Sequence, residues 1–105
     1  MKKVKIVVFV PVESADAVRE AMHGAGAGKI GNYKKVSFSS RGVGRFLPME
    51  GANPSIGEVG RIEQVEEDRI EMVCEESKLE AVVSAMKKVH PYEEAAFDVY
   101  ELKDL

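Results

Sequence analysis

The chain begins with an apolar segment that has few polar interruptions. Residues 4–10 run Val-Lys-Ile-Val-Val-Phe-Val, and β-branched side chains on both faces are typical of a strand in the middle of a sheet. Apolar residues then recur at helical spacing, at Ala15, Val18, Ala21, Met22 and Ala25. Ser14 is a candidate cap for this helix. We expect the helix to end near Met22, because glycines stand at positions 24, 26 and 28.

The middle of the chain predicts strands and one long loop. Residues 32–46 alternate loosely between apolar and polar side chains, which predicts a second strand with irregularities at Gly42 and Gly44. Residues 47–60 are rich in proline and glycine, which favours a long ordered loop. Residues 61–66 and 69–74 predict two further strands, joined as a hairpin by the polar turn at 66–68.

The C-terminal part predicts a helix followed by a strand. Ser77 and Glu80 have the spacing of a capping box. One apolar helical face follows, made of Leu79, Val82, Val83, Met86 and Val89. Pro91 should end this helix at His90, because the residue before a proline is displaced from helical geometry. Residues 96–102 then predict the last strand.

This order of elements predicts the fold class. A strand, a helix, several antiparallel strands, a second helix and a final strand fit an α+β, ferredoxin-like (split βαβ) antiparallel sheet with both helices on one face. The chain has 105 residues, 45% of them hydrophobic and 31% charged. This is ordinary globular composition, and we expect one domain that spans residues 1–105.

Charge and cysteine content limit the classes of partner and the cellular compartment that we expect. The formal net charge is −3 and no basic block occurs, so we expect no nucleic-acid partner. The single Cys74 cannot form an internal disulfide, and we find no signal-peptide pattern, which favours a cytoplasmic location. The longest apolar run, residues 6–11, is far shorter than the roughly 20 residues of a membrane span, and we expect no membrane contact.

Residues 26–31 match the phosphate-loop pattern G-x-G-x-x-G. In a dinucleotide site this pattern lies between a strand and the helix that follows it. Here a predicted helix precedes it instead. We therefore favour a helix stop followed by a tight turn over a phosphate site.

Two further glycine-rich segments, residues 42–46 and 51–57, allow two interpretations. The first is a long loop that needs turns. The second is a ligand surface, because missing side chains let an anion approach main-chain N–H groups, with Arg41 and Arg45 nearby. Loops on rigid elements often carry function, so both interpretations stay open.

Residues 90–94, His-Pro-Tyr-Glu-Glu, are the most polar cluster at an element boundary. His90 with Glu93 is too small a set for a closed zinc site. His90 beside a carboxylate is also a sensible acid–base pair. The simpler interpretation is a helix end at which His90 suits the dipole, and we favour it. We likewise interpret the lone His23 and Cys74 as structural.

Several of these segments together resemble a known family. The motifs are G-A-G-x-I-G-N-Y at 26–33, G-x-G-x-F-x-P-x-x-G-A-N-P-x-I-G at 42–57, R-I-E at 69–71 and H-P-Y-E-E-x-A-F-D-V-Y at 90–100. In this order they resemble the insertion domain of the Nif-three-like family. The chain departs from the family pattern at Val36, often cysteine there, and at Ala95, often proline, so no role of that thiol is carried over. The 90–93 segment is also similar to CutA-like trimers, whose ferredoxin-like fold is shared with PII-like proteins.

The resemblance implies a module without the dinuclear metal domain of the longer family members, whose ligands match no position here. We expect a ligand- or protein-binding, regulatory module rather than an enzyme, with an unidentified ligand or partner. It should form a homo-oligomer, a trimer being favoured. The ligand-binding candidates are Asn32, Tyr33, Arg41, Gly42, Gly44, Arg45, Asn53, His90 and Tyr92. The alternative is a metal-handling protein or enzyme that binds a divalent metal weakly through His90 and Glu93.

Overall fold

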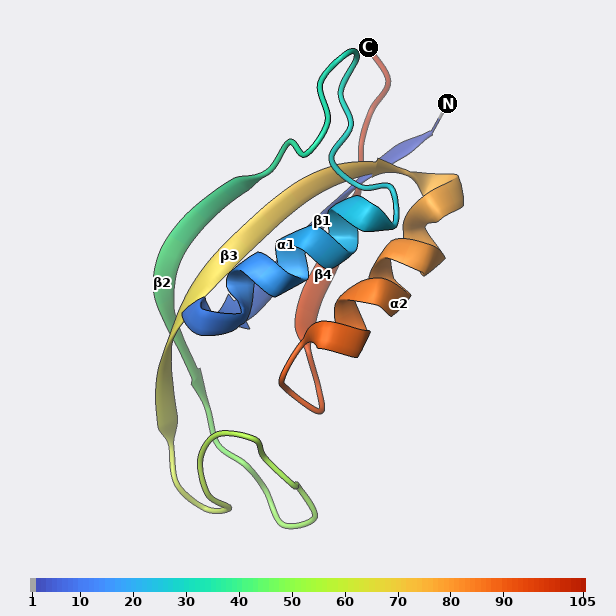
Figure 1. Cartoon of the computed structure of the whole chain (residues 1–105). Helices are drawn as coiled ribbons and strands as arrows, with labels where there is room; N and C mark the ends of the chain where they lie inside the picture. The colour runs from blue at the N-terminus through green and yellow to red at the C-terminus, as the bar shows by residue number, and fades with distance from the viewer. Residues whose placement is uncertain (1) are drawn as a thin grey trace.

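The computed structural model describes residues 2–105 and contains one four-stranded antiparallel sheet (Figure 1). The strands are β1 (Lys3–Pro11), β2 (Phe38–Phe46), β3 (Glu63–Glu75) and β4 (Ala96–Glu101), in the spatial order β2-β3-β1-β4. β1 lies between β3 and β4, as predicted from the apolar side chains on both of its faces. The predicted α+β, ferredoxin-like class is confirmed.

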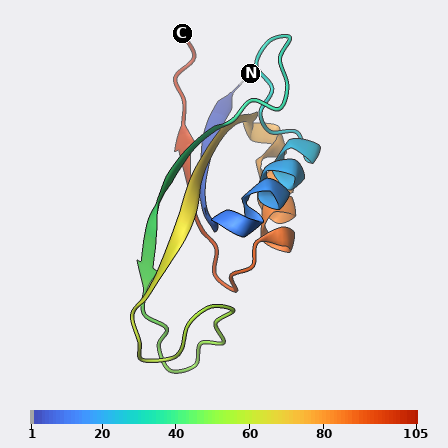
Figure 2. The ribbon, with the colours of Figure 1, turned by 60° about the vertical axis from the view of Figure 1, so that its left-hand side comes forward.

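Both helices cover one face of this sheet, and the other face is bare (Figure 2). α1 (Ala15–Gly24) follows the short 3-10 turn η1 (Val12–Ser14), and α2 (Leu79–Val89) follows η2 (Glu76–Lys78). The helices pack against each other as well as against the sheet. Within residues 2–105, neither helix has the length and apolar character that crossing a membrane requires.

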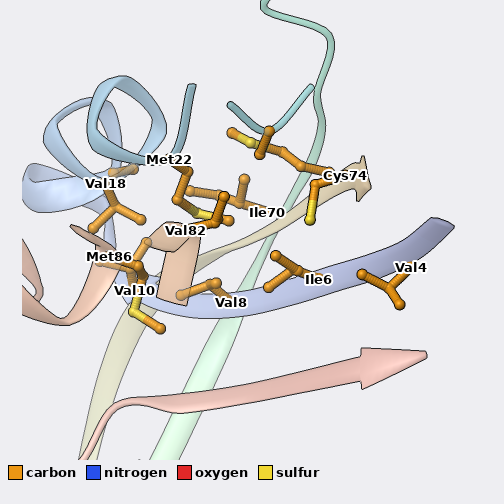
Figure 3. Packing of buried hydrophobic residues seen from close by; sticks show 13 residues of the cluster. Val4, Ile6, Val8, Val10, Val18, Met22, Ile70, Cys74, Val82 and Met86 are labelled. Atoms are coloured by element: carbon orange, nitrogen blue, oxygen red, sulfur yellow. The ribbon is translucent and has the colours of Figure 1, made fainter. Parts of the chain in front are cut away.

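The core lies between the helices and the covered face of the sheet (Figure 3). Alternate residues of β1 contribute to it, and so do Ile70, Met72 and Cys74 of β3, which pair with three of them. The buried apolar side chains include Val4, Ile6, Val8, Val10, Val18, Met22, Ile70, Met72, Val82 and Met86. Complete burial of such a side chain stabilises the fold by about 1.5–3 kcal/mol before entropy is counted.

The predicted hairpin around residues 66–68 is wrong, because β3 runs unbroken from Glu63 to Glu75. Asp68 follows the two-residue alternation of Cys74, Met72 and Ile70, and therefore points toward the helices. Its carboxylate is ion-paired there with Arg19 and Arg41. A buried charge is tolerated in a strand when it is paired, so the polar residues do not interrupt β3.

Other boundaries also differ from the predictions. Ser77 lies inside η2 and α2 begins at Leu79, so the predicted capping box does not form. Ser14 is at the N-cap of α1 but makes no side-chain capping bond, and α1 ends at Gly24 rather than near Met22. The predicted end of the second helix is confirmed, because His90 is extended (φ −68°, ψ 132°).

The segment between α1 and β2 contains turns rather than strand. Gly26 and Gly28 have positive φ angles of 114° and 82°, which suit glycine. Ile30 and Tyr33 form an isolated bridge, and Lys35 has a φ of 59°. The second strand therefore begins at Phe38, and its predicted start at residue 32 is wrong.

Candidate functional site

A ribbon formed by β2 and β3 projects beyond the rest of the sheet. β1 pairs with β3 from Glu67 to Glu75, whereas β2 pairs with β3 from Glu63 to Glu71. The first four residues of β3 therefore have no neighbour from β1. The loop of residues 47–62 joins the two strands at the tip of this ribbon (Figure 1).

The 47–62 loop lies close to the turn that joins α2 to β4. The backbone N–H of Asn53 donates a hydrogen bond of 2.8 Å to Glu93 Oε2. The rings of Phe46 and Tyr92 meet edge to face, with centroids 5.6 Å apart. Two of the motifs singled out in the sequence, at 42–57 and 90–100, thus meet at one end of the molecule.

A cavity of about 390 Å³ lies between these segments, within the usual range for small-ligand sites. We call it the end cleft. Its lining residues are Gly44, Arg45, Phe46, Leu47, Pro48, Met49, Ala52, Pro54, Ser55, Ile56, Glu67, Tyr92, Glu93, Glu94 and Ala96. Most of these are apolar or small, and three of the four charged ones are acidic.

Glu67 is the buried acid of the end cleft. Only 9% of the residue is exposed, and its Oε2 accepts a hydrogen bond of 2.9 Å from the Tyr92 hydroxyl. Its other oxygen, Oε1, lies against Gly44, where a Cβ atom would overlap it. The absence of a side chain at Gly44 therefore makes room for the carboxylate.

The environment of Tyr92 keeps its hydroxyl protonated. Burial raises the pKa of Tyr92 well above its usual value, and the hydrogen bond to Glu67 raises it further. The negative charges of Glu67, Glu13 and Glu63 act in the same direction. Tyr92 is thus a stable hydrogen-bond donor in a negatively charged surrounding.

His90 fixes the turn to the sheet through both ring nitrogens. Nε2 donates a hydrogen bond of 2.8 Å to the Phe9 carbonyl, and Nδ1 accepts one of 3.1 Å from the Tyr92 N–H. Because a carbonyl only accepts and an amide N–H only donates, the ring is the Nε2-protonated tautomer. A metal ion at His90 would have to displace one of these bonds.

The metal alternative therefore stays a prediction with little support from this geometry. Glu93, its second ligand, already accepts the Asn53 N–H. Among residues 2–105, no three histidine, cysteine or acidic residues are grouped so that they could hold a metal ion. Cys74 is buried in the core, and burial raises the pKa of its thiol.

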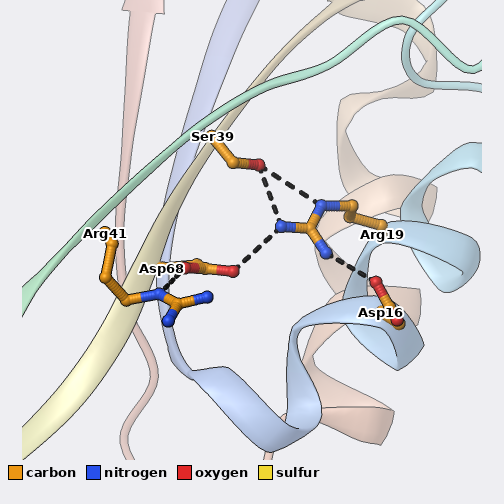
Figure 4. A network of polar contacts seen from close by, with 5 residues as sticks. All are labelled: Asp16, Arg19, Ser39, Arg41 and Asp68. Carbon is orange, nitrogen blue, oxygen red and sulfur yellow. Dashed lines mark hydrogen bonds and ion pairs between the residues drawn. The ribbon is translucent and has the colours of Figure 1, made fainter.

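The two predicted anion-binding arginines differ in their surroundings. Arg41 donates a 2.7 Å hydrogen bond to Asp68, whose second oxygen pairs with Arg19 at 3.0 Å (Figure 4). Arg19 also contacts Ser39 and Asp16. The hydrogen bond from Arg41, opposed by partial burial and aided by Arg19, lowers the pKa of Asp68. Arg41 thus joins β2 to β3 and α1, while Arg45 lies beside the end cleft.

The structure does not bring every predicted ligand residue to one place. Asn32 and Tyr33 are exposed, in the segment between α1 and β2. This segment extends to the opposite end of the molecule from the 47–62 loop (Figure 1). That turn is held by backbone bonds, including one from the Gly28 N–H to the Val73 carbonyl. Gly42 lines an adjoining hollow beside Phe9 and Arg69, which shares Gly44, Glu67 and Ala96 with the end cleft. Of the predicted residues, Gly44, Arg45 and Tyr92 line the end cleft itself. Asn53 and His90 are hydrogen-bonded to residues that line it, Glu93 and Tyr92.

Glu67, the buried acid of the site, is not among the residues predicted from the sequence. It was assigned to a hairpin turn, where acidic residues are common and solvated. Continuing the alternation of β3 past Ile70 would have placed Asp68 on the core face and Glu67 on the opposite face. The pattern would still not have shown that Tyr92 covers Glu67, because the two residues are 25 positions apart.

Proteins of known sequence resemble this chain over nearly all of its length. It is 54% identical over 98 residues to the GTP cyclohydrolase 1 type 2 homolog of Halalkalibacterium halodurans, and 50% identical over 99 residues to that of Bacillus subtilis. These matches cover 93% and 94% of this chain but 26% of each relative. The chain therefore spans 26% of the length of these relatives. No model of a known protein family matches the chain.

Solved structures resemble it as well. A Bacillus cereus protein related to NIF3 has a TM-score of 0.85 and 48% identity, over 98% of this chain and 26% of that one. The CutA divalent cation tolerance protein of Archaeoglobus fulgidus has a TM-score of 0.70 and 15% identity, over 97% and 85%. The second likeness concerns the fold alone. The predicted resemblance to the Nif-three-like family, with the fold of CutA, is confirmed.

Proposed function

We propose that this chain is a binding module, and that the end cleft is its ligand site. The observation that supports this most is the meeting of the 42–57 and 90–100 motifs around a cavity of about 390 Å³. The cavity is lined mainly by apolar groups, with a few convergent polar ones, which is the usual character of a small-ligand site. The module acts by binding and regulation rather than by catalysis.

The charge of the end cleft argues against a polyphosphate ligand. Glu67, Glu93 and Glu94 line it. Glu67 is buried, so its repulsion of a triphosphate is screened least by water. The relatives are named for a GTP cyclohydrolase, but we propose that the end cleft does not bind GTP.

We further propose that the chain forms a homo-oligomer through its sheet edges. The edge strands carry exposed apolar side chains, among them Phe38 and Val43 on β2 and Tyr100 on β4. Open edges with apolar side chains favour pairing with another chain. The resemblance to CutA-like trimers favours three copies.

Amide shifts in a nuclear magnetic resonance titration test the ligand site. The probes are small amines, alcohols and carboxylic acids added to the labelled chain. We expect shifts at Phe46, Ile56 and Tyr92, and expect Ala52→Trp to abolish them by filling the cleft. Ala81→Trp, on an exposed position of α2, is the matched control. Shifts confined to other surfaces, or unchanged in Ala52→Trp, would exclude the end cleft as the site.

A further inference from the structure

Glu67 is a buried carboxylate without a basic partner in the part of the chain that the structure describes. Its one hydrogen bond comes from the neutral Tyr92 hydroxyl, and among residues 2–105 no lysine, arginine or histidine forms an ion pair with it. The neighbouring Asp68, by contrast, pairs with two arginines. A buried charge without a counter-charge is costly, so a cation placed at Glu67 Oε1 would be stabilised.

The arginine that borders the end cleft is not placed to supply this charge. Arg45 lies next to Phe46 at the end of β2, and adjacent strand residues point to opposite faces. The Phe46 ring points toward Tyr92 in the cleft. The Arg45 side chain therefore points to the other face of the ribbon. Arg69, two residues from Glu67 on the same face of β3, pairs with Glu71 and lies over the Phe9 ring. The positive charge is thus left to come from a ligand.

The surroundings of Glu67 favour a cation as well. Glu93 and Glu94 line the same cavity. The charges of Glu67, Glu13 and Glu63 all raise the pKa of Tyr92, which means that each makes the potential at this ring more negative. Phe46 and Tyr92, which line the same cavity, are aromatic side chains of the kind that attract cations.

We propose that the end cleft binds an organic cation: an ammonium group on an apolar chain, with the charge at Glu67 Oε1 and the chain against Phe46 and Ile56. This inference rests on the proposed function, since it names the class of ligand for the same site. The cavity volume of about 390 Å³ suits a small molecule, and its apolar lining suits an aliphatic body.

Three probes with six carbon atoms each distinguish the contribution of charge to the affinity from the contribution of apolar contact. The full chain is titrated at pH 7 and constant ionic strength with n-hexylammonium chloride, n-hexanol or sodium hexanoate, and amide shifts are followed. We expect n-hexylammonium to shift Phe46, Ile56 and Tyr92 with an affinity about tenfold or more above that of n-hexanol, because a buried carboxylate discriminates by charge. Hexanoate should not bind there.

The variant Glu67→Gln tests the assigned residue. A glutamine keeps the size of the side chain and an acceptor for Tyr92, so the n-hexylammonium affinity should fall to that of n-hexanol. Glu80→Gln, on the exposed side of α2, makes the same change in net charge and should have no effect.

The possible outcomes test the cation inference and the proposed ligand site separately. Equal affinities for n-hexylammonium and n-hexanol in the wild-type chain would overturn the cation inference and leave the cleft as a ligand site. The absence of shifts at the cleft with all three probes would overturn both. The comparison of n-hexylammonium with n-hexanol in the wild-type chain decides the cation inference by itself. The inference therefore stays testable even if Glu67→Gln does not fold.

Discussion

At the scale of single residues, Gly44 is the position where the end cleft depends on a missing side chain. A Cβ at Gly44 would overlap the Glu67 carboxylate, which Tyr92 holds in place. A Cβ at Gly42, by contrast, would have no described atom within 4 Å. The two glycines share a strand and a face, so they form a matched pair.

We expect Gly44→Ala to lower the free energy of unfolding by about 1–3 kcal/mol, because Glu67 must move and lose its bond to Tyr92. Gly42→Ala should change it by no more than about 0.5 kcal/mol. Urea unfolding of both variants measures the difference. Equal losses of unfolding free energy in the two variants would show that the backbone of β2 requires glycine, and that contact with Glu67 does not explain the effect.

Asp68 gives the fold a defined pH dependence. Its pKa is lowered in the folded state, so its pairing stabilises the protein above the ordinary aspartate pKa of about 3.9. That contribution to stability is lost as the pH falls from the ordinary aspartate pKa through the lower pKa that Asp68 has in the folded state. We expect Asp68→Asn to cost about 1.5–3 kcal/mol at pH 7 and to flatten the decrease in stability in acid.

Thermal unfolding from pH 7 to pH 2 checks this expectation. Asp16→Asn is the control, because Asp16 also pairs with Arg19 but its side chain is 99% exposed. A pH profile of Asp68→Asn that parallels the wild-type profile would contradict a role for Asp68 in acid stability.

His90 shows what the sequence could not reveal at this scale. Pro91 correctly predicted the end of the helix at His90, because proline acts on its immediate neighbour. The ring's partner is the Phe9 carbonyl, 81 positions away. A local pattern therefore left metal binding, acid–base chemistry and a structural role open, and only the fold shows that both nitrogens are occupied.

At the scale of elements, the 47–62 loop is held to the 90–95 turn by few contacts. Among the hydrogen bonds of residues 2–105, the bond from the Asn53 N–H to Glu93 Oε2 joins the centre of the loop to the turn. The adjacent Glu94 lines the same cleft but makes no such bond in residues 2–105.

We expect Glu93→Ala to increase amide hydrogen exchange at residues 52–57 about two- to tenfold, as expected for the loss of about 0.5–1.5 kcal/mol. Glu94→Ala should leave the exchange unchanged. Exchange measured by mass spectrometry on both variants checks this. Similar exchange in the two variants would mean that the hydrogen bond does not restrain the loop.

The elements that the sequence predicted well are those with local signals. The apolar runs located β1, α2 and β4 within one or two residues. β3 was divided in two because Glu66, Glu67 and Asp68 resemble a turn by composition, and the arginines that neutralise Asp68 come from α1 and β2. Such long-range pairing overrides local preference and is invisible to a short window.

At the scale of the whole molecule, the exposed apolar edges predict assembly. We expect a mass three times the 11.5 kDa of one chain in light scattering after size exclusion at tens of micromolar. Val43→Lys places a charge on the edge strand β2 and should reduce the mass, because edge charges discourage pairing. Val89→Lys, at the end of α2 and also exposed, is the control. A single-chain mass for the wild type would exclude the oligomer.

The position of β1 between β3 and β4 has a consequence for biosynthesis. Val4 pairs with Cys74 on one side and with Glu101 on the other. A ribosome therefore releases β1 long before it has made either neighbour, and the loops to be closed are long. During that interval the apolar residues of β1 are free to bind a chaperone or another nascent chain. Translation speed through the second half of the message should thus influence the soluble yield more than speed through the first.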